Sequence, residues 1–149
     1  MAMTMTGEVK LAATRDIVWA KLNDPEVLKL CIPGCEELEK VSDHEFVAVA
    51  TNKIGPVKAR FKGRVQLTDL DPPNGYRISG EGQGGIAGFA KGGATVRLSD
   101  DEGGTLLSYN VQAEIGGKIA QLGQRLVNSA AKSMADDFFV RFANSVASV

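Results

Sequence analysis

Few side chains in this sequence of 149 residues are of the types that do covalent chemistry. The single histidine, His44, stands between Asp43 and Glu45 in a predicted turn, with no nucleophile or second metal ligand nearby in the sequence. A histidine acts as a catalytic base or a metal ligand only beside such a partner. We therefore expect His44 to be an ordinary surface residue.

The two cysteines, Cys31 and Cys35, enclose the sequence Ile-Pro-Gly. Their spacing differs from the Cys-x-x-Cys redox motif, and no second pair is present to complete a zinc site. No basic region followed by a long apolar run opens the chain, so no secretory signal is indicated. We expect two free, structural cysteines in a cytoplasmic protein, where thiols stay reduced.

A glycine-rich segment over residues 82–87 formally matches the dinucleotide-binding fingerprint, with alanine in the last position. That fingerprint requires a strand that leads into a helix whose N-terminus holds the pyrophosphate. Here three more glycines follow by residue 93, and residues 95–98 return to the alternation of a strand. We therefore interpret the glycines as bends or bulges that curve a sheet.

Asp136 and Asp137 follow each other on a predicted helix, where consecutive side chains diverge by about 100°. They do not converge on one substrate as an acid pair. Because the sequence offers no general base, nucleophile or metal cluster, we predict that the protein is not an enzyme. Its 17 basic and 18 acidic residues are nearly balanced, so global charge gives no argument for nucleic-acid binding.

A row of four cations alternates with apolar residues in one predicted strand, over residues 57–67. Side chains alternate between the two faces of a strand and repeat on each face about every 6.6 Å. One face therefore carries the basic row, Lys58, Arg60, Lys62 and Arg64. Two interpretations stay open: a solvated face whose charges pair with Glu45 or Glu81, or a docking surface for an acidic partner or anionic lipid.

The chain is long enough for one domain with a core of its own, which we place at residues 6–149. Residues 1–5, with three methionines, are expected to be a disordered or vector-derived start. The apolar pattern predicts a strand over 6–13, a helix over 15–22 and a second short helix that begins at Pro25 after the cap Asp24. It then predicts six strands, over 36–42, 45–53, 57–70, 75–83, 89–99 and 104–115.

Short turns separate these six strands and leave no room for crossover helices, so the sheet is expected to be an antiparallel meander. Residues 117–146 contain no proline and carry apolar residues at helical spacing. The stripe has phenylalanines near its C-terminal end and small residues before them, namely Gly123, Ala130, Ala131 and Ala135. A helix of this shape can cross a curved sheet and leave space beneath its centre.

We therefore predict an α+β, helix-grip fold. A curved antiparallel sheet of about seven strands wraps around a long C-terminal helix, and two short helices follow the first strand. A large sheet with one helix-covered face must curl around that helix to bury its apolar stripe. The space left beneath the helix suggests a protein that encloses an apolar guest.

Several segments resemble one protein family. They are Thr14 to Trp19 after the first strand, Leu30 to Glu37 with its Ile-Pro-Gly-Cys sequence, Ile54 to Val57 before the basic strand, and Gly116 to Leu126. Together they are similar to the carbon monoxide dehydrogenase G-subunit family, which belongs to the START-like helix-grip superfamily. The resemblance covers about residues 6–146.

The resemblance implies an accessory protein that serves a molybdenum hydroxylase of the carbon monoxide dehydrogenase type. Its partners would be the subunits of that enzyme at the inner face of the membrane. An anionic membrane surface as a further partner follows from the docking interpretation of the basic row. Superfamily members bind hydrophobic small molecules between sheet and helix, and here the implied ligand is a quinone or another lipid, with no covalent cofactor. Longer family members carry an apolar C-terminal anchor, whereas this chain stops at Val149. We therefore expect any membrane contact to use the domain itself.

For the wall of the cavity we predict seven residues at inward positions, with two more near its entrance. The wall residues are Phe61, Val65, Phe89, Tyr109, Leu126, Ala130 and Met134, and the entrance residues are Leu28 and Ile32. Inward aromatic residues serve core packing as well as ligand contact, so both interpretations stay open. Two other functions also stay open: an assembly factor with a vestigial cavity, and a START-like cyclase or hydrolase.

Overall fold

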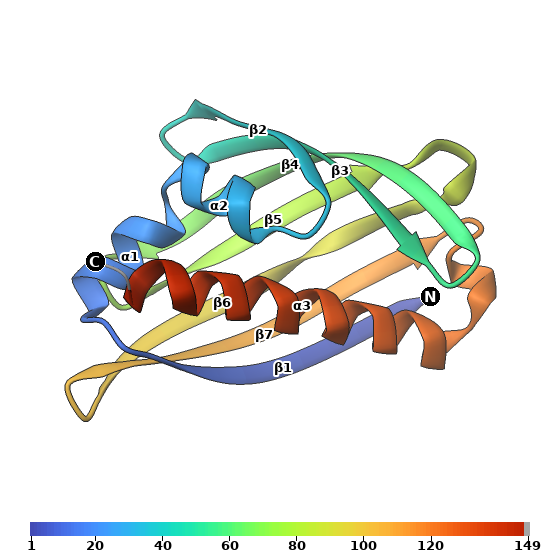
Figure 1. Ribbon diagram of the computed structural model, residues 1–149. Helices are drawn as coiled ribbons and strands as arrows, with labels where there is room; N and C mark the ends of the chain where they lie inside the picture. Colours follow the sequence, from blue (N-terminus) through green and yellow to red (C-terminus); the bar gives the residue numbers. More distant parts are fainter. Residues whose placement is uncertain (148–149) are drawn as a thin grey trace.

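The chain forms one sheet, one long helix and two short helices, and the computed structural model describes residues 1–147 (Figure 1). The strands are β1 (Ala2–Leu11), β2 (Cys35–Ser42), β3 (Glu45–Ile54), β4 (Val57–Asp71), β5 (Gly75–Gln83), β6 (Phe89–Asp101) and β7 (Gly104–Gly116). The helices are α1 (Arg15–Leu22), α2 (Pro25–Cys31) and α3 (Gln124–Ala147), with 3-10 turns η1 (Gly85–Ala87) and η2 (Ala120–Leu122).

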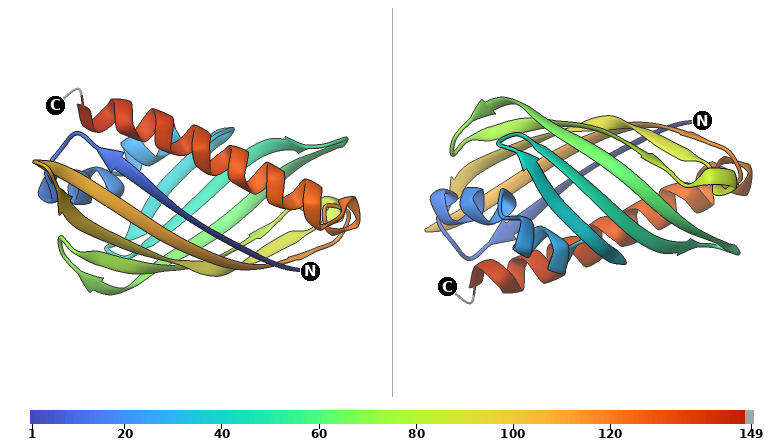
Figure 2. Two further views of the ribbon diagram at one scale, coloured as in Figure 1. Left: turned by 90° about the horizontal axis from the view of Figure 1, so that it is seen from below. Right: turned by 90° about the horizontal axis from the view of Figure 1, so that it is seen from above.

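All seven strands belong to one antiparallel sheet in the order β1-β7-β6-β5-β4-β3-β2. Strands β2 to β7 pair with their neighbours in sequence, and β1 adds to the free edge of β7. The sheet curves, and α3 crosses its concave side while α1 and α2 lie near the C-terminal end of α3 (Figures 1 and 2). This arrangement confirms the predicted helix-grip fold.

The first strand begins at Ala2, so the opening residues left out of the predicted domain are part of the sheet. Its ladder with β7 runs from Ala2 opposite Glu114 to Leu11 opposite Thr105. Met3 is only 7% exposed, because the odd-numbered residues of β1 face the helix, as in any strand with a two-residue period.

The two short helices have the predicted bounds, and they pack against the core at the end where α3 terminates. At α2, the Asp24 side chain accepts a hydrogen bond from the backbone N–H of Glu26, and Pro25 occupies the first turn, where its missing N–H costs nothing. At α1, Thr14 is the N-cap residue by position, but its side chain makes no capping hydrogen bond.

The long helix begins later than its apolar pattern predicts. Gly117 and Gly123 have φ values of +82° and +94°, which limit the helical part of the segment between them to the single turn η2. Regular α-helix starts at Gln124 and continues for 24 residues.

Two buried clusters hold α3 to the sheet, one at each end of the helix. The cluster at the C-terminal end contains Phe142, which is fully buried, with Val146, Val18 and Leu107. The cluster at the N-terminal end is smaller and contains Val127, Met3, Ile115 and Ile119. The helix is therefore fixed most firmly at its C-terminal end.

Removal of the Phe142 ring should destabilise the fold strongly. We expect Phe142→Ala to lower the free energy of unfolding by about 3–5 kcal/mol, measured by urea denaturation, because a buried aromatic ring is lost and a cavity remains. Val140→Ala, on the exposed face of the same helix, should change it by less than about 0.5 kcal/mol. Equal effects of the two substitutions would contradict this account of the anchor.

Candidate functional site

Two apolar cavities lie between the inner face of the sheet and α3. The first cavity, of about 240 Å³, is lined by Met3, Asn52, Ile54, Phe61, Gly82, Ala90, Ile115, Ile119, Val127, Ala130, Ala131 and Met134. The second cavity, of about 260 Å³, is lined by Leu22, Leu28, Ile32, Leu38, Phe46, Ala48, Val65, Leu67, Tyr76, Ile78, Val96, Leu107, Phe138 and Phe139.

The two cavities follow each other along the same elements. On α3, Met134 lines the first cavity, and Phe138, one turn later, lines the second. On β4, Phe61 likewise lines the first cavity and Val65 the second. The inward position between them on β4 is Gly63, which faces Gly82 across the ladder. This middle part of the sheet has no side chains with which to fill the space beneath the helix.

Six of the nine predicted ligand-binding residues line these cavities. Phe61, Ala130 and Met134 belong to the first, and Leu28, Ile32 and Val65 belong to the second. Of the small helix residues, Ala130 and Ala131 line the first cavity, so the thin part of the helix does lie over open space. Gly123 precedes the helix instead.

The other three predicted ligand-binding residues, Phe89, Tyr109 and Leu126, line neither cavity. Phe89 lies on the outer face, because β6 turns its neighbour Ala90 inward. Tyr109 faces inward, but its ring stacks on Phe139 with centroids 5.2 Å apart. Leu126 is 37% exposed and packs against the turn at Gly55.

Polar groups are rare around both cavities. Of the described residues that line the first cavity, only Asn52 is polar, and its amide donates a hydrogen bond of 3.3 Å to the carbonyl oxygen of Pro33. At the second cavity, burial raises the pKa of the Tyr76 hydroxyl, and the ring meets Trp19 edge-on at 5.3 Å. Such walls are apolar and offer few groups for proton transfer.

The Ile-Pro-Gly-Cys segment connects α2 to the sheet and brings Ile32 to the second cavity. Gly34 has a φ of +71°, and its carbonyl oxygen accepts a hydrogen bond from the N–H of Thr51 in β3. Cys31 is buried and Cys35 partly so, and both are free, as predicted. Burial raises the pKa of both thiols, which lowers their reactivity.

The basic row stands on the outer face of the sheet, as the alternation of β4 predicts. Arg60 pairs with Glu36 at 3.1 Å, and Arg64 pairs with Glu45 at 3.0 Å, so the predicted pairing with Glu45 is confirmed. Arg64 reaches Glu45 although Glu81 lies directly opposite it in the ladder. The Thr51 hydroxyl and the Arg60 guanidinium hold the pKa of Glu36 below its ordinary value.

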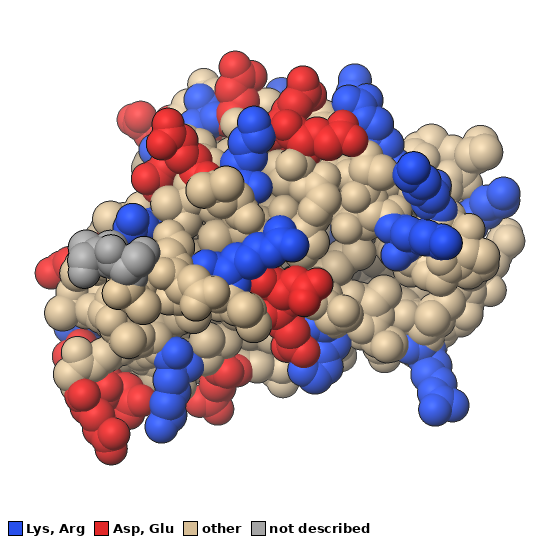
Figure 3. Space-filling model, viewed as in Figure 1, with Lys and Arg blue, Asp and Glu red and all other residues tan. Residues whose placement is uncertain are grey.

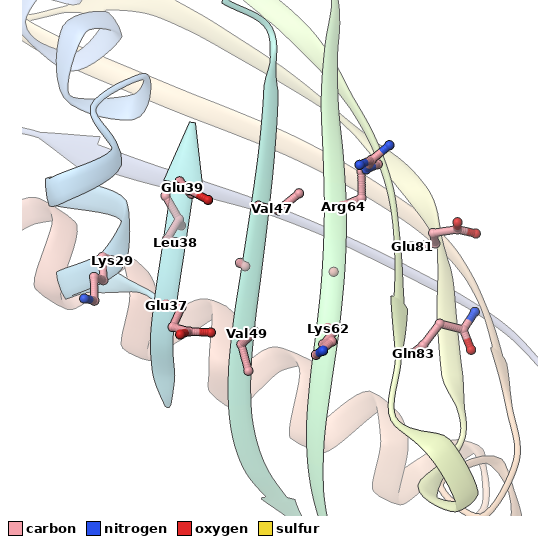
Figure 4. A pocket seen from close by; sticks show the side chains of 12 residues that line it. Lys29, Glu37, Leu38, Glu39, Val47, Val49, Lys62, Arg64, Glu81 and Gln83 are labelled. Carbon is pink, nitrogen blue, oxygen red and sulfur yellow. The ribbon is translucent and has the colours of Figure 1, made fainter. Parts of the chain in front are cut away.

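A hollow of about 780 Å³ opens on this outer face across β2 to β5 (Figure 4). Short side chains of β3 form its floor, and longer charged side chains form its sides. The floor includes Val47 and Val49, and the sides include Glu37, Glu39, Lys62, Arg64 and Glu81. In contrast to the cavities beneath the helix, the hollow is open and lined by charges of both signs.

The family model for the G subunit of carbon monoxide dehydrogenase (CoxG) matches residues 7–147. The chain belongs to the CoxG family. This is a family of accessory subunits, so membership supports an accessory role alongside carbon monoxide dehydrogenase.

Several solved structures share the fold of this chain. A conserved protein from Geobacillus kaustophilus is 33% identical, with a TM-score of 0.92 over 98% of this chain and 96% of that one. A Chromobacterium violaceum protein is 14% identical, with a TM-score of 0.70 over 96% of both chains. A Rhodobacter sphaeroides protein is 18% identical, with a TM-score of 0.69 over 98% and 93%. The last two show the fold alone, and no curated protein matches the chain.

Two further observations concern the described part of the CoxG domain. Within residues 1–147, no helix is long and apolar enough to span a bilayer. The same residues contain no group of three or more His, Cys, Asp or Glu side chains that could hold a metal ion, and His44 is exposed.

Several cavity residues of the CoxG domain were missed by the sequence prediction. They come from alternate positions of the other strands, for example Ile54, Ile78, Gly82, Ala90 and Val96. The alternation that could have found them is visible in the sequence. It identifies the inward face, however, and not which inward residues border a void.

The buried Tyr76 predicts a loss of stability at alkaline pH. Its pKa is raised in the folded state, so above about pH 10 the unfolded chain releases a proton that the folded chain keeps, and unfolding is favoured. Between about pH 9 and 11, the free energy of unfolding should therefore fall more steeply for the wild type than for Tyr76→Phe. The free energies of unfolding are measured by urea denaturation at each pH. If they fell in parallel for the two proteins, the burial of a neutral Tyr76 hydroxyl would be contradicted.

Proposed function

We propose that this CoxG-family protein is a non-catalytic accessory protein of a molybdenum hydroxylase. It binds an apolar ligand such as a quinone beneath α3, and it assists the enzyme in electron-acceptor delivery or membrane recruitment. The observation that carries the proposal is the pair of apolar cavities in line between sheet and helix.

The size of the cavities supports a ligand with a small head and a narrow tail. At about 240 and 260 Å³, each cavity is slightly smaller than the range of about 300–1,000 Å³ typical of small-molecule pockets. A quinone ring with a short isoprenoid tail is of this size. A longer tail could follow the inward glycines from one cavity to the next, past Met134, whose unbranched side chain adapts readily.

Asn52 supplies the polar contact that a quinone carbonyl would need. One N–H of its amide is directed to Pro33, while an amide nitrogen carries two donors. The second donor is available to a carbonyl oxygen in the first cavity. A single polar group in an apolar wall is a common way to orient such a ligand.

The first test is to fill the first cavity from the helix. Ala130→Trp should place an indole in that space and abolish binding of a short-chain quinone, measured by titration calorimetry. Ser129→Trp, at the neighbouring exposed position, should bind as the wild type does. Circular dichroism checks that both variants fold. Unchanged binding by a folded Ala130→Trp variant would contradict the cavity assignment and favour an assembly factor with a vestigial cavity.

The outer face suits a partner protein better than a lipid surface. Arg60 and Arg64 are already paired, and carboxylates such as Glu37 and Glu39 border the same hollow as Lys62. Charges of both signs around an open hollow fit a polar protein surface, where complementarity sets orientation and association rate. The basic row is therefore our candidate for contact with the enzyme subunits.

Charge reversal in this row should weaken association with the enzyme. We expect Lys62→Glu to slow association with purified molybdenum hydroxylase severalfold at low salt, by surface plasmon resonance, and the difference should shrink as salt is added. Lys10→Glu, an exposed change on β1, should have little effect. If the association rate changed neither with the substitution nor with the salt concentration, this surface would be excluded as the docking face.

A further inference from the structure

Three connections meet at the end of the molecule where α3 begins, and we call them together the loop end. They are the β3–β4 turn (residues 54–57), the η1 segment (84–88) and the segment from 117 to 123 before α3 (Figures 1 and 2). The N–H of Ile119 donates to the carbonyl oxygen of Ala87 at 2.9 Å, which joins the second and third. Gly55 packs against Leu126, which joins the first to α3.

The loop end exposes apolar side chains. Ile86, at the tip of η1, is 87% exposed, more than any other large apolar side chain among the described residues. Leu126 and Phe89 are each 37% exposed at the same end. Single exposed apolar residues are ordinary, but here three lie at one end, and the most exposed one follows Gly84 and Gly85 and precedes Ala87 and Gly88.

Cations surround these apolar residues. Lys53, Lys58, Lys118 and Arg125 are exposed, and no ion pair is formed by any of the four within residues 1–147. Lys53 and Lys58 lie directly opposite each other in the β3–β4 ladder. Like charges in that position repel, and neither lysine forms an ion pair within residues 1–147, although Lys58 helps to lower the pKa of Glu36. An anionic partner would offset the remaining repulsion.

Carboxylates are sparse at this end. Figure 3 shows blue and tan atoms, but no red ones, where α3 begins, whereas red atoms gather over the centre and the other end of the same face. Glu114, near the end of β7, is held at 2.6 Å by the amino group of Met1. The loop end therefore has a net positive charge around an apolar tip.

Two of these connections and the start of α3 contribute to the wall of the first cavity. Ile54 from the β3–β4 turn, Ile119 from the segment before α3, and Val127 from the first turns of α3 all line it. An apolar molecule that enters or leaves the first cavity at this end would pass directly between these side chains.

We propose that the loop end is a docking surface for an anionic lipid bilayer, with Ile86 inserted among the lipids and the four cations at the headgroups. Cations near an anionic bilayer and apolar side chains inserted in it reinforce each other, and neither is sufficient alone. This inference rests on the proposed function, because it makes the loop end the path between the bilayer and the first cavity. It shares only Lys58 with the basic row, whose other three cations lie further along β4 on the outer face of the sheet.

The insertion of Ile86 can be tested directly with a fluorescent side chain. Ile86→Trp should be quenched by vesicles of phosphatidylcholine with about 30% phosphatidylglycerol and brominated acyl chains, and its emission should shift to shorter wavelength. Leu30→Trp is the matched control, since Leu30 is 76% exposed on α2, near the opposite end. Its emission should not change, and the wild type reports the background from Trp19. The proposal would be overturned if Leu30→Trp were quenched and Ile86→Trp were not, or if neither variant were quenched.

The electrostatic part has its own test in the unlabelled protein. Lys118→Gln and Arg125→Gln should each lower the partition coefficient on the same vesicles about fivefold, and pure phosphatidylcholine vesicles should bind weakly. Lys10→Gln and Lys40→Gln, exposed residues away from the loop end, should bind as the wild type does. Equal losses for all four variants would overturn the assignment to this end. Quinone binding without vesicles separates the two proposals, since a failed docking surface leaves it intact.

Discussion

The structure depends on the contact between the phenylalanine-rich end of α3 and the concave side of the sheet. Phe142 and Val146 are almost without exposure, and they pack with residues from α1 and β7. This cluster fixes the direction in which the helix crosses the sheet. Toward its N-terminus the helix then presents alanines to inward glycines, and neither side has enough volume to close the gap.

The cavities follow from this difference between the two ends of the helix. Close-packed interiors leave few voids larger than a water molecule, and apolar walls make such voids stable places for apolar molecules. Here a large buried cluster at the C-terminal end of α3 and a smaller one at its N-terminal end hold the helix above the sheet. The protein can therefore keep an internal space without loss of its fold, which is what a carrier of an apolar ligand requires.

Charge divides the surface into regions that suit different contacts. On the outer face, arginines of β4 are tied to carboxylates of β2 and β3, which leaves a mixed surface around an open hollow. At the end of the molecule where α3 begins, lysines and an arginine that form no ion pair within residues 1–147 lie at the same end as the exposed Ile86. A protein partner on the sheet and a bilayer at the loop end would share only Lys58, at the start of β4.

Much of this fold could be predicted from local pattern. Alternation identified all seven strands, and the Asp24-Pro25 pair marked the start of α2, because caps and strand periods are properties of a few neighbouring residues. The same reasoning extended the last helix back to residue 117, since a period does not reveal that Gly123 adopts a left-handed φ. It also left residues 1–5 out of the sheet, because a strand added at an edge is stabilised by its distant partner β7.

The sequence by itself determined the order of the elements, the face on which the cations stand, and the thin middle of the apolar stripe, because each depends on residue type and spacing alone. Only the tertiary structure decided which inward residues border open space. Phe89 turned outward and Tyr109 stacked on Phe139, while Ala90 and Gly82 became cavity wall. The physical reason is that a cavity is volume left unfilled between elements distant in sequence, so it depends on strand register and on where the helix rests.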